Sequence, residues 1–243
     1  ARETADMIIV DDNFTSIVEG IKEGRVAYAN IRKIILFLIS CGLAEVAFFC
    51  LSIVLNLPMP LVAIQLLWLN VVTDGVQDFA LSFEKAEKGI LKEKPRDPKE
   101  SIFNKELLQE ILVSGGVIGT VVFTVWYFLL NKFNMEVDMA RGYIMALMVF
   151  IQNIHVFNCR SEHRSAFATP LSNNWFILCG VLASILLQII VMEVPFFSQF
   201  LQTVSIPFGH LAYLFATAAL ILIVIEFYKL INNSIRRSKN KNA

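Results

Sequence analysis

Six apolar runs, each about as long as a membrane is thick, dominate this sequence of 243 residues. A helix needs about 20 residues to cross the roughly 30 Å hydrocarbon core of a bilayer. Hydrophobic side chains make up 56% of the chain, against about 45–50% in ordinary soluble proteins. A large soluble helical protein is the alternative, but its core helices would rarely stay uncharged for as long as residues 165–192 do. The sequence therefore predicts an all-α, polytopic membrane bundle of six transmembrane helices, at about 30–56, 59–83, 106–131, 139–159, 173–194 and 207–230.

Lysine and arginine collect in alternate connections between these runs. They are frequent in the 84–105 loop, in the fourth-to-fifth connection and in the C-terminal tail, and sparse in the connections between those. Cytoplasmic loops of membrane proteins carry the excess of these residues. We therefore expect both termini and the 84–105 loop to be cytoplasmic. The formal net charge of zero gives no indication of a nucleic-acid partner.

The run at 59–83 contains polar and acidic residues where a membrane helix is ordinarily apolar. A carboxylate at the centre of a bilayer costs about 2.5–3.5 kcal/mol or more, so it is rarely there without a partner or a function. Asn70, Asp74 and Asp78 recur at four-residue intervals and share one face of a helix, which Thr73 borders. This pattern favours a polar site inside the membrane.

A second acid, Glu45, lies in the preceding apolar run. The proline-rich turn at 57–60 predicts a tight hairpin that brings Glu45 and Asp74 to similar depths. Gly75 directly follows Asp74, and we expect the helix to unwind there and free backbone carbonyls. Hard cations such as Ca²⁺ take about six to eight oxygen ligands. The sequence therefore predicts a cation site, and the alternative is a network of hydrogen bonds around protonated acids.

The fourth run ends in polar residues at three-residue intervals, Gln152, His155 and Asn158. They can face the interior together and either complete a cation shell or hydrogen-bond neighbouring helices. A lone histidine near a helix end is more often a packing residue than a ligand, and we interpret His155 in that way.

Other features favour structural roles. Gly115 and Gly119 in the third run predict a close helix–helix seam. Gln188, Glu193 and Glu226 lie near the ends of the last two runs, where we expect them to extend toward the membrane surface.

Several segments resemble the C-terminal membrane domain of P-type cation-transporting ATPases. LWLNVVTDG at 67–75 closely resembles the sixth transmembrane helix of these pumps, especially of calcium pumps of the sarcoplasmic-reticulum and secretory-pathway type. LISCGLAEV at 38–46 resembles their fifth helix, and FNCRSEHRS at 157–165 resembles the cytoplasmic end of their eighth. Residues 5–33 resemble the end of their phosphorylation domain and the stalk. The resemblance implies that the six runs are the family's helices five to ten.

This resemblance implies a division of the chain into three regions. They are a stub of the phosphorylation domain and stalk at 1–29, a transport domain at 30–233 and a basic cytoplasmic tail at 234–243. The family's DKTG and TGDGVND motifs do not occur, so we expect a fragment without catalytic residues. The resemblance implies that ATP and Mg²⁺ bind to absent parts of a longer, multi-pass ATP-driven pump. We expect that pump to reside in the plasma membrane. Its expected partners are the lipid bilayer, the phosphorylation domain and transmembrane helices one to four.

The resemblance also implies ligands for the transported cation. Carried over by position, they are Glu45, Asn70, Thr73 and Asp74, with Asp78 and Gln152 as additional candidates. Gly42 stands where two-site calcium pumps place an Asn, and Gln152 where they place a Glu, which weakens the same one of their two sites. We therefore expect one Ca²⁺ per cycle. Asp78 is an extra acid that fits a proton-carrying site, a site for a different ion, or a protonated or paired acid.

Other functions remain open at this point. The transported ion of a P-type pump with these residues is alternatively Na⁺, K⁺, H⁺ or Mn²⁺. A secondary cation transporter would bury acids in the same way, although residues 30–131 and 139–230 show no related repeats. A noncatalytic membrane scaffold would use the acids in hydrogen bonds between helices.

Overall fold

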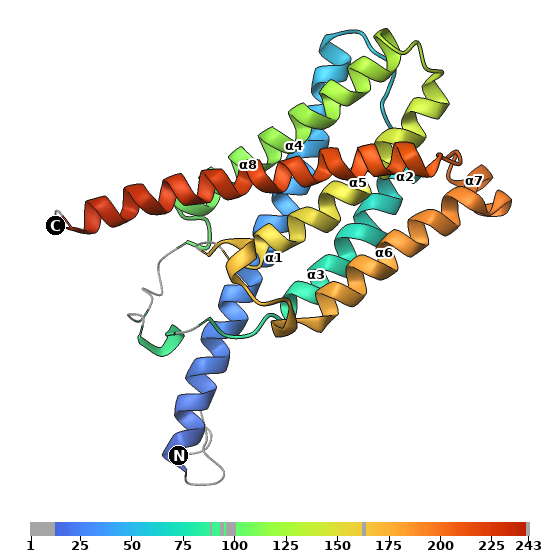
Figure 1. Cartoon of the computed structure of the whole chain (residues 1–243). Helices are drawn as coiled ribbons and strands as arrows, with labels where there is room; N and C mark the ends of the chain where they lie inside the picture. The colour runs from blue at the N-terminus through green and yellow to red at the C-terminus, as the bar shows by residue number, and fades with distance from the viewer. Residues whose placement is uncertain (1–12, 88, 93–94, 96–100, 162–163, 242–243) are drawn as a thin grey trace.

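The computed structural model describes residues 13–87, 89–92, 95, 101–161 and 164–241, and the regular elements among them are all helical (Figure 1). Residues 1–12 of the predicted stub at 1–29, and parts of the 84–105 loop, lie outside the described residues. Within the described residues, five helices are long and apolar enough to cross a membrane. The chain is an integral, multi-pass membrane protein with the predicted all-α fold.

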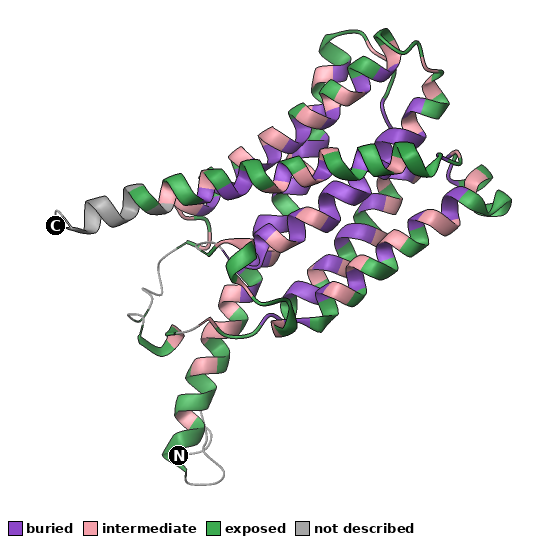
Figure 2. Cartoon of the chain, viewed as in Figure 1, coloured by how far each residue is buried: buried purple, intermediate pink, exposed green. Residues whose placement is uncertain are grey.

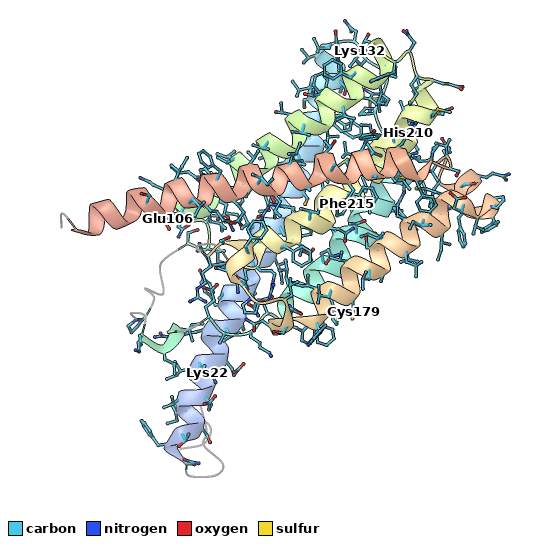
Figure 3. All side chains as sticks on the ribbon, viewed as in Figure 1. Lys22, Glu106, Lys132, Cys179, His210 and Phe215 are labelled. Atoms are coloured by element: carbon cyan, nitrogen blue, oxygen red, sulfur yellow. The ribbon has the colours of Figure 1, made fainter. Side chains whose placement is uncertain are left out.

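The first predicted run continues a long helix, α1 (Phe14–Val54), of 41 residues. The Asn13 side chain begins it by accepting a hydrogen bond from the main-chain N–H of Thr15 at 3.0 Å. The helix joins the expected stalk and the first span without interruption. Figure 3 shows Lys22 on the part of α1 that extends beyond the bundle, and Lys132 at the opposite end. After α1, Asn56 adopts a positive φ of 53°, which Asn tolerates better than most residues, and the proline-rich turn follows.

The second predicted run forms three consecutive helical pieces. They are α2 (Ala63–Trp68), a π-helical turn η2 (Leu69–Asp74) and α3 (Gly75–Ser82). The prediction that the helix unwinds at Gly75 is wrong, because the main-chain N–H of Gly75 donates a hydrogen bond to the carbonyl of Asn70, five residues earlier. The helix widens there instead of opening, and its backbone stays hydrogen-bonded. π-Helical turns are rare and frequently occur at functional sites.

The remaining spans agree with the predicted runs to within a few residues, except that the last helix is longer. They are α4 (Lys105–Asn131), α5 (Val137–Cys159), α6 (Trp175–Glu193) and α8 (Phe208–Lys241). Short elements join them: η3 (Ile90–Lys92), η4 (Ala166–Ala168), η5 (Leu171–Asn173) and α7 (Pro195–Phe200). The α8 helix runs on into the segment predicted as a basic tail.

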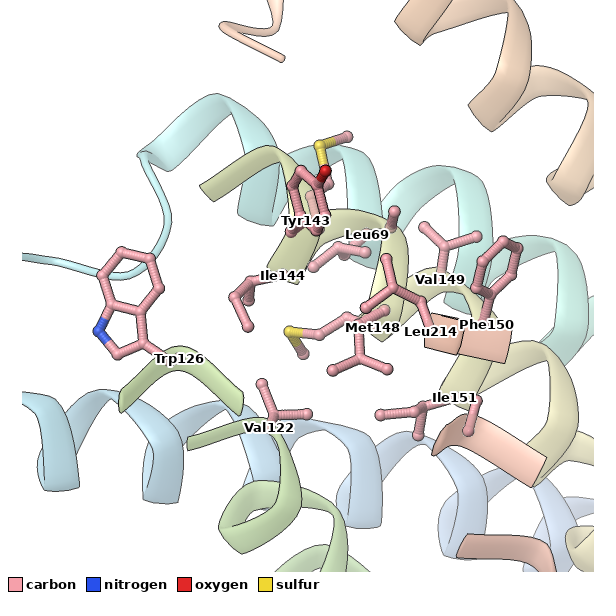
Figure 4. Close-up of a cluster of buried hydrophobic side chains, with 14 of the residues drawn as sticks. Leu69, Val122, Trp126, Tyr143, Ile144, Met148, Val149, Phe150, Ile151 and Leu214 are labelled. Carbon is pink, nitrogen blue, oxygen red and sulfur yellow. The ribbon is translucent and has the colours of Figure 1, made fainter. Parts of the chain in front are cut away.

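Helix α5 lies at the centre of the bundle, between α8 and the other spans (Figures 1 and 2). Its most apolar stretch is 89% buried, against 22–39% in the other four membrane-length helices. Figure 4 shows its core, in which Ile144 and Met148 of α5 lie near Val122 and Trp126 of α4 and Leu69 of η2. The other spans therefore present most of their apolar surface outward, as expected where lipid or further helices cover them.

The glycine seam predicted in the third run is confirmed. A Cβ atom at Gly115 would lie 2.9 Å from the Cβ of Leu43, and one at Gly119 would lie 2.9 Å from the carbonyl oxygen of Ala44. These distances are shorter than side chains tolerate, so α4 approaches α1 this closely only because both residues lack a side chain.

Two of the three residues expected to extend toward the membrane surface do not. Gln188 is buried and its Oε1 accepts a hydrogen bond from the indole N–H of Trp68 at 3.0 Å. Glu226 is also buried and accepts from the main-chain N–H of Ala166 at 2.9 Å. A fixed donor lies within reach of each, so burial with a hydrogen bond replaces exposure. Glu193 does lie at the surface, bonded to the Ser205 hydroxyl.

Buried charged groups tie the end of α3 to the ends of α5 and α6. The Arg160 guanidinium donates to both carboxylate oxygens of Glu84, at 2.9 and 3.0 Å. The amide of Asn174 donates to the same carboxylate at 3.1 Å and to the carbonyl of Ala80 at 2.8 Å. These contacts fix the C-terminal end of α3, the helix that follows η2.

Candidate cation site

Helix α1 and the π turn η2 meet at the residues predicted to bind the cation. The amide Nδ2 of Asn70 lies 3.4 Å from Oε2 of Glu45, and it also donates to the carbonyl of Leu66 at 2.9 Å. The hairpin formed by the first two runs therefore places Glu45 beside the polar residues of the second, as its proline-rich turn predicted.

Several oxygens at this point are buried without a hydrogen-bond partner among the described residues. They are Oε1 of Glu45, Oγ1 of Thr73 and both carboxylate oxygens of Asp74. Thr73 is fully buried, and Asp74 is 1% exposed. A buried carboxylate that lacks a partner is costly, so these oxygens require a cation, a proton or water. Oxygen donors of this kind are what Ca²⁺ takes as ligands.

The polar residues of the second run do not share one environment. Asn70 is exposed and Asp78 is partly buried, whereas Asp74 is almost completely buried. A π turn accommodates one residue more than an α-helical turn, so it rotates the positions that follow it relative to those before. The single common face expected from four-residue spacing is therefore only partly present.

The additional candidates, Asp78 and Gln152, also have unpartnered buried atoms. These are Oδ1 of Asp78 and both side-chain polar atoms of Gln152. No hydrogen bond joins either residue to Glu45 or Asn70 in the described part of the chain. Nor do three or more His, Cys, Asp or Glu side chains in that part come together as a metal-binding group. A site here would therefore combine Glu45 and Asp74 with neutral oxygens.

The structure contains a buried polar network beside the site that the sequence did not predict. The amide of Gln77 donates to Oδ1 of Asn153 at 2.7 Å, and the amide of Asn153 donates to the Ser184 hydroxyl at 3.0 Å. This network joins α3, α5 and α6 at the first turn of α3, immediately after the π turn. The position of Gln77, four residues after Thr73, was a usable signal, but nothing in the sequence marked Ser184.

His155 has a structural environment, as interpreted from the sequence. Its Nε2 lies 2.8 Å from the hydroxyl of Ser40, and its ring stacks on Phe37 with centroids 5.9 Å apart. The imidazole therefore connects α5 to α1 beside the candidate site.

Comparison with known proteins identifies the family. Residues 58–231 match the family model of the cation transporting ATPase C-terminus. The chain is 37% identical over 209 residues to a calcium-transporting ATPase of Bacillus subtilis (strain 168), which covers 86% of this chain and 23% of that protein. It is 33% identical over 242 residues to the human (Homo sapiens) calcium-transporting ATPase type 2C member 1, covering 99% of this chain and 26% of that protein. The chain spans about a quarter of the length of these relatives. Since the family match extends from the proline-rich turn through the π turn and every later span, this chain belongs to the cation-transporting ATPases and corresponds to their C-terminal region.

Proposed function

We propose that this chain is the C-terminal membrane part of an ATP-driven calcium pump, and that Glu45, Asn70, Thr73 and Asp74 hold the transported ion. The observation that carries the proposal is the buried carboxylate of Asp74, both of whose oxygens lack a hydrogen-bond partner in the described structure. A transported cation would satisfy these oxygens. The names of the relatives, calcium-transporting ATPases, support Ca²⁺ as that cation.

In this proposal α1 transmits movement to the site. At 1.5 Å per residue, its 41 residues span about 60 Å, from the extended stalk to the membrane hairpin. A displacement of the stalk would move Glu45 relative to Asn70, whose connecting contact of 3.4 Å is long for a hydrogen bond. The site would thereby gain and lose a carboxylate ligand. Aspartyl phosphorylation, ATP and Mg²⁺ belong in this proposal to parts of the protein beyond this chain.

We further propose that one Ca²⁺ moves in each cycle, with both termini in the cytoplasm of a cell whose plasma membrane holds the pump. Gly42 contributes no ligand, and Gln152 supplies a neutral amide in place of a carboxylate. The distribution of Lys and Arg among the connections supports the orientation.

The test uses the full-length protein in sealed vesicles. Asp74→Asn removes the buried charge with little change in shape, and we expect it to abolish both Ca²⁺ uptake and Ca²⁺-stimulated ATP hydrolysis. Asp138→Asn is the matched control, because Asp138 is an exposed acid outside the site. Normal Ca²⁺ uptake by the Asp74→Asn variant would overturn the proposed site. ATP hydrolysis stimulated by Mn²⁺ or Na⁺ but not by Ca²⁺ would overturn the assignment of Ca²⁺ as the transported ion.

A further inference from the structure

A cavity of about 930 Å³ opens beside the ends of α3 and α5, away from the candidate cation site. Its walls come from α1, the segment after α3, the connection between α5 and α6, and α8. Figure 1 shows these elements converging where the chain leaves α5. This is the end of the bundle where Lys and Arg are frequent, which we expect to be cytoplasmic.

The described lining of this cavity has an excess of positive charge. Its four cationic residues are Lys33, Lys85, Arg160 and Arg164, and its two acids are Glu84 and Glu87. Both acids already face a cation, since Glu84 is paired with Arg160 and Glu87 lies 3.7 Å from the ammonium of Lys33.

The two remaining cations are available to a ligand. Lys85 and Arg164 are exposed, and the side chain of neither forms an ion pair or hydrogen bond with the described residues. Arg164 is instead held through its main-chain N–H, which donates to the Ser161 hydroxyl at 3.1 Å. Two cations that line one cavity, and whose side chains form no ion pair with the described residues, attract a singly or doubly charged phosphate group.

The cavity adjoins an exposed apolar surface of α8. Leu230 of α8 lines it, and Leu230 shares one helical face with Phe227 and Ile223, at intervals of three and four residues. All three side chains are largely exposed, at 58–64%. A molecule with its charged end in the cavity would therefore find an apolar stripe of α8 for its chains.

We propose that this cavity binds an anionic phospholipid, with the headgroup phosphate between Lys85 and Arg164 and an acyl chain along the α8 stripe. Anionic lipids are concentrated in the cytoplasmic leaflet, and basic pockets between membrane helices bind their headgroups. The lipid joins the stalk, the segment after α3 and α8 at one point. This assignment does not depend on which cation the protein transports.

The test measures lipid binding to the purified full-length protein. Phosphatidylserine is titrated into protein held in phosphatidylcholine, and bound lipid is counted by native mass spectrometry. Each basic residue near a membrane surface contributes about 1 kcal/mol to attraction of anionic lipid, which corresponds to about five-fold in affinity. We expect Lys85→Gln and Arg164→Gln each to weaken phosphatidylserine binding about five-fold, and the double variant about thirty-fold.

Matched variants separate this site from general surface charge. Lys132→Gln removes an exposed lysine at the opposite end of the bundle (Figure 3) and should leave binding unchanged. Lys85→Arg with Arg164→Lys should retain it, and Leu230→Ser should weaken phosphatidylserine binding without affecting inorganic phosphate. Equal binding of phosphatidylcholine and phosphatidylserine, or an equal loss with Lys132→Gln, would overturn the proposal. So would inorganic phosphate binding that depends on the two cations while lipid binding does not.

Discussion

The buried ion pair between Glu84 and Arg160 allows a sharp prediction about stability. The two side chains are 2% and 1% exposed and form two charge-assisted hydrogen bonds. Arg160 also donates to the carbonyls of Thr169 and Pro170. Arg160→Met would remove these bonds and leave the Glu84 carboxylate buried, with Asn174 as its one side-chain donor in the described part of the chain.

The expected cost of Arg160→Met is about 3–5 kcal/mol in the free energy of unfolding, because removal of one partner leaves an uncompensated buried charge. Replacing both partners by apolar residues of similar volume, Glu84→Leu with Arg160→Met, is expected to cost much less, since no charge remains buried. The double variant should therefore be more stable than Arg160→Met alone.

The assay is equilibrium unfolding of the purified full-length protein in mixed micelles, followed by circular dichroism. Asp138→Asn is the control, because it breaks an ion pair at 2.8 Å in which Asp138 is 68% exposed. Such exposed pairs contribute about 0–1 kcal/mol. An Arg160→Met protein as stable as the Asp138→Asn protein would refute the reasoning. A double variant whose cost equals the sum of its two single variants would also refute it.

Three further predictions concern the helix seam and the ion path. Gly119→Val should lower stability by about 1–3 kcal/mol through overpacking, measured by the same unfolding assay, whereas Gly116→Ala should be tolerated because nothing lies within 4 Å of its added Cβ. Asp78→Asn removes a partly buried acid and should change the pH dependence of Ca²⁺ uptake; an unchanged profile would leave Asp78 without a proton-carrying role. Gly42→Asn also has open space for its Cβ, so with Gln152→Glu it should raise the Ca²⁺ transported per ATP from one toward two, and a constant ratio would contradict the one-site interpretation.

The sequence predicted the spans well because their signal is local. A membrane helix must satisfy its own backbone hydrogen bonds and present apolar side chains for about 20 residues, so each run carries its own evidence. The short proline-rich turn predicted that Glu45 would lie at the depth of Asp74, and in the structure the hydrogen-bond partner of Glu45 is Asn70, one turn earlier. The predicted ligand roles of these residues await the proposed transport measurements.

The features that the sequence did not predict depend on contacts between distant segments. The π turn replaces unwinding at Gly75 where η2 packs against α5 and its neighbours, and four-residue spacing alone cannot distinguish these outcomes. Gln188 is buried because the indole N–H of Trp68 lies 120 residues away in the chain but only 3.0 Å away in space. The same is true of Ser184, which becomes informative only once Asn153 faces it.

The polar contacts of α1 are distributed unevenly along its length, and this bears on how movement of the stalk would reach the candidate cation site. Between residues 34 and 54, two side-chain hydrogen bonds link α1 to other described spans, through Ser40 and Glu45. On the N-terminal side of that stretch of α1, the amide of Asn30 donates to the carbonyls of Ser82 and Glu84, at 3.0 and 2.8 Å. A displaced stalk would therefore act directly on the end of α3, while the side chain of Glu84 holds that end to α5.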